Sequence, residues 1–146
     1  MPEFKVAIPS YDRENVIGRK TLKMLNENNI KKSSITIFVA NKEQKTKYEN
    51  VLGDEYKIVV GVKGIKNIRN FITNYYPNGE LVLCIDDDIT GIYEGEPTGK
   101  SSKRVYNLKS LAYRGFSICK KMGYALWGLN PSNNVRSLKS KNKITT

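Results

Sequence analysis

Three consecutive aspartates, Asp86, Asp87 and Asp88, directly follow the apolar run Leu81–Ile85. Neighbouring carboxylates repel one another, so such a run is unfavourable unless a cation offsets its charge. A divalent metal ion is a suitable cation, because its preferred oxygen ligands include carboxylates and phosphates. Side chains alternate across an extended strand, and we therefore expect Asp86 and Asp88 to hold the metal while Asp87 faces the other way. The alternative is an acidic run that forms a turn or caps a helix.

A second segment that could bind a ligand runs from Lys63 to Asn70 and follows an apolar run. Gly64 allows a ligand to approach the backbone closely, and the first amides of the helix predicted to begin here attract phosphate. Arg69 adds a guanidinium that can donate two parallel hydrogen bonds to a phosphate group. The alternative is an arginine on the solvated face of a surface helix.

The elements that must position these residues alternate along the chain. Short β-branched runs followed by segments of helical periodicity predict an α/β domain with a mainly parallel sheet flanked by helices. We expect strands at Phe4–Pro9, Ile35–Ala40, Tyr56–Val62 and Leu81–Ile85, and helices with the apolar residues Val16, Ile17, Leu22, Met24 and Leu25, at Glu43–Leu52 and at Ile65–Tyr75. Because parallel strands place their carboxyl ends at one edge of the sheet, we expect Ser10–Arg13, Asn41 and Asp86–Asp88 to face the same crevice.

The pattern changes after Asp88. We expect a short strand at Ile92-Tyr93, a mobile loop over Gly95–Lys103 and a strand at Tyr124–Trp127. Asn107 can cap a helix that closes at Gly123. Together these elements predict one α/β domain over residues 1–134 and a basic, flexible tail over residues 135–146.

The charge of the chain is distributed unevenly. Its 146 residues have a formal net charge of +11, and residues 97–146 contain 11 Lys+Arg but no Asp or Glu. Such a segment suits a polyanionic partner such as nucleic acid or an anionic membrane surface, and a solvated tail is the alternative. The absence of histidine excludes His-dependent catalytic triads and zinc sites that use His.

The two cysteines, Cys84 and Cys119, stand in apolar patterns where small buried residues are expected. Two cysteines are too few for a disulfide framework, which indicates a reducing compartment. No apolar run is long enough for a membrane span, and the N-terminal residues do not form a signal sequence. We therefore expect a cytoplasmic protein without a membrane span.

Taken together, the motifs resemble those of nucleotide-sugar glycosyltransferases with the A-type fold, the family 2-like group. Ile8–Arg13 is similar to their IPTYNR opening, Lys63–Asn70 matches KGxxxxRN, and Leu81–Asp88 looks like their strand and Asp-x-Asp metal motif. The resemblance covers about residues 4–94, with the motifs in the family's order. The segment Tyr124–Pro131 is also similar to part of the phage-associated glycosyltransferases linked to oxidised or hydroxymethylated pyrimidines in DNA.

This resemblance implies a short version of the Rossmann-like A-type fold and a metal-dependent transfer of a sugar from a nucleoside-diphosphate donor. The residues at matching positions, implied to bind the nucleotide sugar, are Pro9, Ser10, Tyr11, Arg13, Asn41, Lys63, Gly64, Arg69, Asn70 and Asp87. Asp86 and Asp88 match the carboxylates that hold Mn2+ or Mg2+ against the donor diphosphate. The metal would neutralise the charge that develops on the departing nucleoside diphosphate.

The acceptor is the second partner of such a reaction, and the basic segment makes DNA a candidate, in a host cell's cytoplasm if the protein is viral. Transfer to a base requires a flipped or single-stranded nucleotide, on which Tyr106, Trp127 or Tyr124 could stack. Asn130, in the segment similar to the phage group, is a further candidate contact. For Trp127, packing in the core is the alternative.

Several positions depart from the family pattern. The acidic residue that usually follows the second strand is replaced by Asn41-Lys42, no Asp or Glu follows Glu96 to act as a late catalytic base, and there is no His metal ligand. A shortened enzyme, a fragment and a degenerate copy therefore stay open, and no catalytic residue is assigned. The alternative functions are a catalytically reduced nucleic-acid-binding module and a nucleotidyltransferase, although the first strand lacks the Gly-rich phosphate loop that would favour a nucleotidyltransferase.

Overall fold

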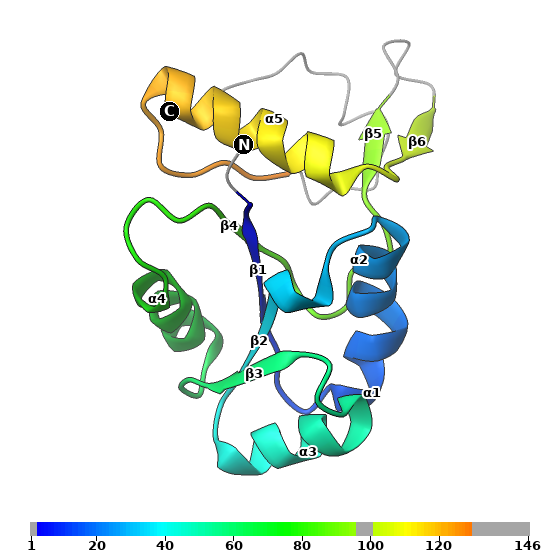
Figure 1. The fold of residues 1–146 in the computed structure, drawn as a ribbon, viewed down its shortest axis with the longest axis vertical. Coiled ribbons are helices and arrows are strands. Elements are labelled where there is room, and N and C mark those ends of the chain that lie inside the picture. Colours follow the sequence, from blue (N-terminus) through cyan, green and yellow to red (C-terminus); the bar gives the residue numbers. More distant parts are fainter. Residues whose placement is uncertain (1–2, 96–100, 130–146) are drawn as a thin grey trace. The chain divides into compact units, whose positions relative to one another are not determined.

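The computed structural model of the chain describes residues 3–95 and 101–129 (Figure 1). Its contacts divide the chain into two compact units, unit 1 up to Thr90 and unit 2 from Gly91. The sequence predicted a single domain over residues 1–134. The tail predicted for residues 135–146 lies outside the described residues.

Unit 1 is built on a four-stranded parallel sheet with the strand order β3-β2-β1-β4. The strands are β1 (Lys5–Pro9), β2 (Ile35–Val39), β3 (Lys57–Val60) and β4 (Val82–Cys84). All four predicted strands are confirmed, although most end one or two residues inside the predicted bounds. The α/β class with a parallel sheet flanked by helices is therefore confirmed.

Both faces of this sheet are covered, which explains why its central strands are apolar along their whole length. Every residue of β2 is buried, and β1 is buried from Val6 to Pro9. On one face Ala7 and Phe38 pack with Ile68 and Ile72 of helix α4 (Ile65–Tyr75). The other central residues, such as Val6, alternate to the opposite face.

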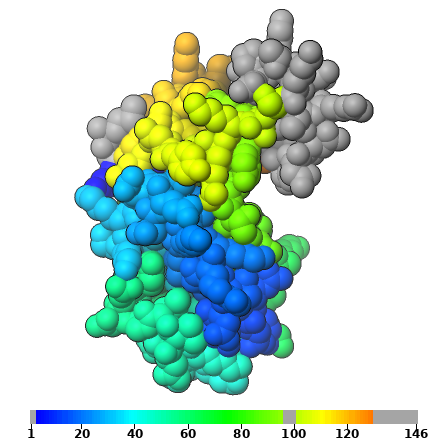
Figure 2. Space-filling view, turned by 90° about the vertical axis from the view of Figure 1, so that its right-hand side faces the viewer, coloured from blue at the N-terminus to red at the C-terminus, as the bar shows by residue number. Residues whose placement is uncertain are grey.

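The helices of unit 1 lie on both sides of the sheet, with α4 on one side and the first helical segment on the other (Figure 1). That first segment consists of α1 (Glu14–Ile17), a π-helical turn η1 (Gly18–Leu22) and α2 (Lys23–Glu27), and the remaining elements are η2 (Lys32–Ser34) and α3 (Lys42–Leu52). Figure 2 shows the blue surface of α1 beside α3, with which it is in contact. The predicted helices are confirmed, and α4 has the bounds that the sequence predicted.

Unit 2 contains a two-stranded antiparallel ribbon and one helix. The ribbon pairs β5 (Tyr93–Gly95) with β6 (Ser102–Arg104), and the helix is α5 (Leu108–Met122). Asn107 caps α5 and Gly123 ends it in the left-handed conformation with φ 71°, as predicted. β6 corrects the prediction of a loop through Lys103, because cross-strand pairing with β5 orders a segment that has no apolar pattern of its own.

The segment after α5 is not the strand that the sequence predicted for Tyr124–Trp127. It turns back at Gly123 and binds the helix, where the thiol of Cys119 hydrogen-bonds to the carbonyl of Leu126 at 3.3 Å. The Trp127 ring lies against Gly115, where a Cβ would come within 2.5 Å of the ring. The carbonyl of Leu126, which a strand would pair with a neighbouring strand, is therefore bonded to α5 instead.

The two cysteines have different environments. Cys119 is buried as expected, but Cys84 is exposed, because β4 is the edge strand of the sheet. Among the helices of residues 3–95 and 101–129, none is long and apolar enough to cross a membrane.

Candidate functional site

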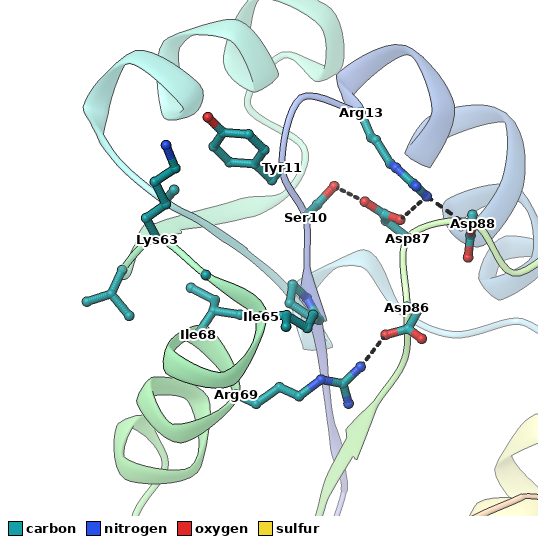
Figure 3. Close-up of a pocket in the computed structure, with 14 residues that line it drawn as sticks. Ser10, Tyr11, Arg13, Lys63, Ile65, Ile68, Arg69, Asp86, Asp87 and Asp88 are labelled. Carbon is teal, nitrogen blue, oxygen red and sulfur yellow. Dashed lines mark hydrogen bonds and ion pairs between the residues drawn. The ribbon is translucent and has the colours of Figure 1, made fainter.

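A cavity of about 620 Å³ lies where the strands of unit 1 end (Figure 3). Its lining comes from the segments that follow all four strands: Pro9, Ser10, Tyr11, Arg13, Ala40, Val62, Lys63, Gly64, Ile65, Ile68, Arg69, Asp86, Asp87 and Asp88. The chain runs from β1 to β2 and β3 on one side, whereas β4 lies on the other side of β1. The ends of β1 and β4 therefore form a topological switch point, the usual ligand position in open α/β sheets.

The end of β1 is joined to the end of β4 by a buried hydrogen-bond chain. Ser10 Oγ donates to the carboxylate of Asp87. Because this uses the only hydrogen of the hydroxyl, Ser10 accepts from the phenol of Tyr48, and Tyr48 in turn accepts from the backbone N–H of Arg13 at 3.1 Å. The chain fixes the distance between two loops that are 77 residues apart in sequence.

Tyr48, on α3, is a site residue that the sequence analysis missed. Its side chain is fully buried, and this burial raises the pKa of the phenol. The hydroxyl therefore stays protonated and keeps its role as a donor to Ser10. Within a polar helix the position carried no chemical signal, because its partners lie on a different element.

The three aspartates are divided between two arginines. Asp87 and Asp88 lie in a turn beyond β4, and both accept hydrogen bonds from Arg13, at 3.2 and 3.0 Å. Asp86 instead pairs with Arg69 at 2.8 Å. Asp87 alone is buried, and Asp86 and Asp88 are both exposed, so burial alternates along the three residues although the strand ends at Cys84; a metal held by Asp86 and Asp88 stays a prediction.

Burial differs among these carboxylates. Asp87 is buried at 7% exposure, whereas Asp86 and Asp88 are exposed to the cavity and solvent. The hydrogen bond to Asp88, followed by the charges of Asp87 and Asp88, raises the pKa of the Arg13 guanidinium. Figure 3 shows the two arginines on either side of the aspartate turn. The acidic groups are thus balanced by two fixed cations.

Thr21 stabilises the aspartate turn through hydrogen bonds to its backbone. The sequence analysis also missed this residue. Its hydroxyl donates to the carbonyl of Asp86 at 2.7 Å and accepts from the N–H of Ile89 at 2.9 Å. Thr21 is fully buried and belongs to the π-helical turn η1. π-Helical turns occur frequently at functional sites. This one places the Thr21 hydroxyl where it bonds to both ends of the aspartate turn.

The turn after β1 is fixed by Gln44 of α3. Gln44 donates to the carboxylate of Asp12 at 2.6 Å and accepts from the Asp12 backbone N–H at 2.8 Å. These bonds hold Asp12 at φ 49°, a left-handed conformation. The hydrogen bond from Gln44, aided by Lys47, lowers the pKa of the Asp12 carboxyl.

The start of α4 forms a further wall of the cavity. Gly64 precedes the helix at φ 97° and has no side chain that could cap the first amides. Lys63 places its ammonium over the ring of Tyr11, with 5.7 Å between the nitrogen and the ring centroid. Amides, ammonium and guanidinium groups therefore converge on one side of the cavity, an arrangement that suits an anion.

Most residues that the sequence analysis selected line this cavity, but six do not, among them Tyr124 of unit 2. Asn41 follows β2 at the same edge, yet its side chain caps α3 by accepting from the N–H of Gln44. Asn70 is on α4 and does not line the cavity. Tyr106 and Trp127 belong to unit 2, and Asn130 lies outside the described residues.

The predicted metal site can be compared with the groups that are present. Asp86 and Asp88 supply exposed carboxylate oxygens, the ligand type that Mg2+ and Mn2+ prefer. Within residues 3–95 and 101–129, however, no cluster of three His, Cys, Asp or Glu side chains could hold an ion. The two carboxylates are thus of the ligand type that a divalent cation takes, but they are only two, and each already has an arginine partner.

Comparison of the chain with models of protein families, with curated proteins and with solved structures gave no match.

Proposed function

We propose that the chain is a metal-dependent glycosyltransferase with a short A-type fold, and that the cavity of unit 1 binds its nucleoside-diphosphate sugar. One observation carries the proposal: segments 9–13, 62–69 and 86–88 converge on a single cavity at the switch point of a parallel sheet. Ligands of open α/β sheets bind in this place. A volume of about 620 Å³ is within the range of small-molecule sites.

The charges around the cavity support a diphosphate as the anionic part of the ligand. The uncapped first amides of α4 and the guanidinium of Arg69 lie on one wall, and Arg13 lies on another. Guanidinium groups bind phosphate oxygens through paired hydrogen bonds, and a helix N-terminus favours negative charge. These groups would hold the diphosphate between β1 and α4.

Tyr11 supports an aromatic base as the other part of the ligand. Its ring is 45% exposed and lines the cavity under the ammonium of Lys63. An exposed ring beside a cation provides a flat face on which a nucleotide base can stack. The ring and the cationic wall together suit a nucleotide better than inorganic phosphate alone.

The metal part of the proposal rests on Asp86 and Asp88. When bound there, Mn2+ or Mg2+ would neutralise the negative charge of the departing nucleoside diphosphate. The same carboxylates bind Arg69 and Arg13, so an ion and these guanidiniums compete for them. We therefore expect nucleotide affinity to depend on Mn2+, because an ion that binds Asp86 and Asp88 leaves Arg69 and Arg13 free to bind the phosphates.

Calorimetric titration with UDP and GDP, in Mn2+ and in EDTA, tests the proposal. We expect saturable binding in Mn2+ and a loss of at least tenfold in EDTA or in Asp88→Asn, which removes one charged ligand, equivalent to about 1.4 kcal/mol. Arg69→Ala should weaken binding similarly, whereas Arg19→Ala, which removes a guanidinium of unit 1 outside the cavity, should not. Equal affinity for all variants would contradict the donor site.

Sugar transfer separates the enzyme from its alternative. The acceptor in our proposal is a hydroxymethylated pyrimidine of DNA, and incubation of such DNA with a labelled nucleotide sugar would measure transfer. Donor binding without transfer or donor hydrolysis would instead support a catalytically reduced nucleic-acid-binding module that keeps the donor-site fold.

A further inference from the structure

The ribbon of unit 2 places two tyrosines and an arginine on one face. Tyr93 and Arg104 are directly paired across the antiparallel strands, so their side chains project from the same face. Tyr106 lies in the bend that follows β6, two residues beyond Arg104. The guanidinium carbon of Arg104 lies 5.6 Å from the centroid of the Tyr106 ring.

Gly91 brings the other tyrosine into the same group. A Cβ built on Gly91 would come within 3.1 Å of the Tyr93 ring and 3.3 Å of Nε of Arg104. Both side chains therefore lie against the same piece of glycine backbone. The three side chains form one group on the ribbon, which we call the aromatic column (Tyr93, Arg104 and Tyr106).

The two tyrosines of the aromatic column face solvent even though they are large aromatic residues. Tyr93 is 55% exposed and Tyr106 is 62% exposed, so their rings contribute little to a core. The backbone beneath them is ordered, because the N–H of Val105 bonds to the carbonyl of Ile92 at 2.8 Å and Asn107 caps α5. A preorganised exposed ring loses little conformational freedom when it binds a flat partner.

The described residues of unit 2 carry an excess of positive charge. Residues 101–129 contain six Lys and Arg residues and no acidic residue. On the ribbon itself, Glu94 is opposite Lys103 and is engaged by Arg114 at 2.8 Å. Exposed π faces next to an excess of positive charge are complementary to unstacked bases joined by phosphates.

We propose that the aromatic column is a stacking site for the bases of single-stranded nucleic acid. Bases stack on the rings of Tyr93 and Tyr106, and Arg104 supplies a planar cation beside the Tyr106 ring, while the positive charge of unit 2 attracts the phosphates. Duplex DNA lacks exposed base faces and an anionic membrane lacks bases, so neither uses the rings. The inference does not depend on the proposed donor site, because all its residues belong to unit 2.

The test is fluorescence anisotropy of the full chain with a labelled oligo(dT) over a series of salt concentrations. We expect Tyr106→Ala and Tyr93→Ala each to weaken binding about fivefold or more without changing the salt slope, because a ring binds no phosphate. Tyr106→Phe should keep the wild-type affinity. Tyr124→Ala, the removal of another exposed tyrosine of unit 2, is the matched control and should have no effect.

Two variants of Arg104 separate stacking from charge. Arg104→Ala should lower both the affinity and the salt slope, whereas Arg104→Lys should keep the slope but lose affinity, because an ammonium has no planar face. Circular dichroism and the fluorescence of Trp127, the only tryptophan, show whether each variant is folded.

Three results would overturn the inference. One is wild-type affinity in folded Tyr93→Ala and Tyr106→Ala variants. Another is equal affinity for oligo(dT), for the matched duplex and for vesicles containing phosphatidylserine, which would indicate general attraction of anions by the basic surface. The third is the absence of oligo(dT) binding to the wild-type chain even at low salt.

Discussion

The cavity of unit 1 and the aromatic column of unit 2 arrange charge in opposite ways. In the cavity the aspartate turn is matched by Arg13 and Arg69, and its central carboxylate, that of Asp87, is buried and held by Ser10 as well. In unit 2 the positive charges of residues 101–129 have no acidic residue among them, and the rings of the column are exposed.

This difference indicates two kinds of recognition. Opposite charges held around the buried hydrogen bond of Asp87 define the geometry of a small site, and its buried part responds weakly to salt. An exposed surface with an excess of one charge attracts a polymer of the opposite charge over a longer range, and this attraction falls as salt rises. The predictions below use substitutions in both units to test this contrast.

The largest effect is expected for Phe38→Ala in the sheet of unit 1. Phe38 is fully buried and contacts Tyr75 edge to face, with 5.1 Å between the ring centroids. Its truncation leaves a cavity under α4, so we expect the free energy of unfolding to fall by about 3–5 kcal/mol. Urea denaturation followed by circular dichroism measures this change, and a loss below about 1 kcal/mol would show that the sheet does not depend on this core.

The next effect distinguishes the buried from the exposed carboxylate of the cavity. Asp87→Ala leaves the buried hydroxyl of Ser10 without its acceptor, and we expect a loss of about 2 kcal/mol in the free energy of unfolding. Asp88→Ala removes an exposed partner of the same arginine and should change it by only about 0.5 kcal/mol. Equal losses in urea denaturation would contradict the structural role of the buried chain.

A third prediction tests whether Trp127 packs against helix α5. Gly115→Ala places a methyl group against the Trp127 ring, so we expect a loss of about 1–3 kcal/mol and a red shift of the Trp127 emission. Gly128→Ala is the matched control, because a Cβ there meets nothing within 4 Å. An unchanged emission spectrum in Gly115→Ala would show that Trp127 does not pack on α5 in solution and is available for stacking.

The last prediction is a loss of about 1 kcal/mol at neutral pH for Tyr48→Phe, because the donor to Ser10 is lost while the ring still fills its site. Burial raises the pKa of Tyr48 in the folded protein. Its contribution is therefore complete below the unfolded value of about 10 and is lost as the pH rises through the folded value.

The urea midpoint of Tyr48→Phe should thus fall less steeply above about pH 10 than that of the wild type. Burial also raises the pKa values of Tyr56 and Tyr76. Their ionisation therefore lowers the stability of both proteins at alkaline pH. Parallel alkaline curves for the two proteins would contradict the buried role of the Tyr48 hydroxyl.

By itself the sequence determined the local elements of this protein. The four strands, helix α4 and the two ends of α5 follow from β-branched runs, helical periodicity and the residues Asn107 and Gly123, which act within a few positions of themselves. The sequence also predicted that the strand ends meet at one edge, because parallel strands all have their carboxyl ends at the same edge of the sheet. Most of the cavity lining could therefore be predicted.

Only the tertiary structure decided which groups meet. The pairing of Arg13 with Asp87 and Asp88, and of Arg69 with Asp86, depends on a turn that begins where β4 ends. Tyr48 and Thr21 reach residues 38 and 65 positions away, a distance over which periodicity carries no information. The strand order that brings β4 beside β1, and the pairing that sets Tyr93 opposite Arg104, are contacts between distant segments, so packing and hydrogen bonding across the fold select them.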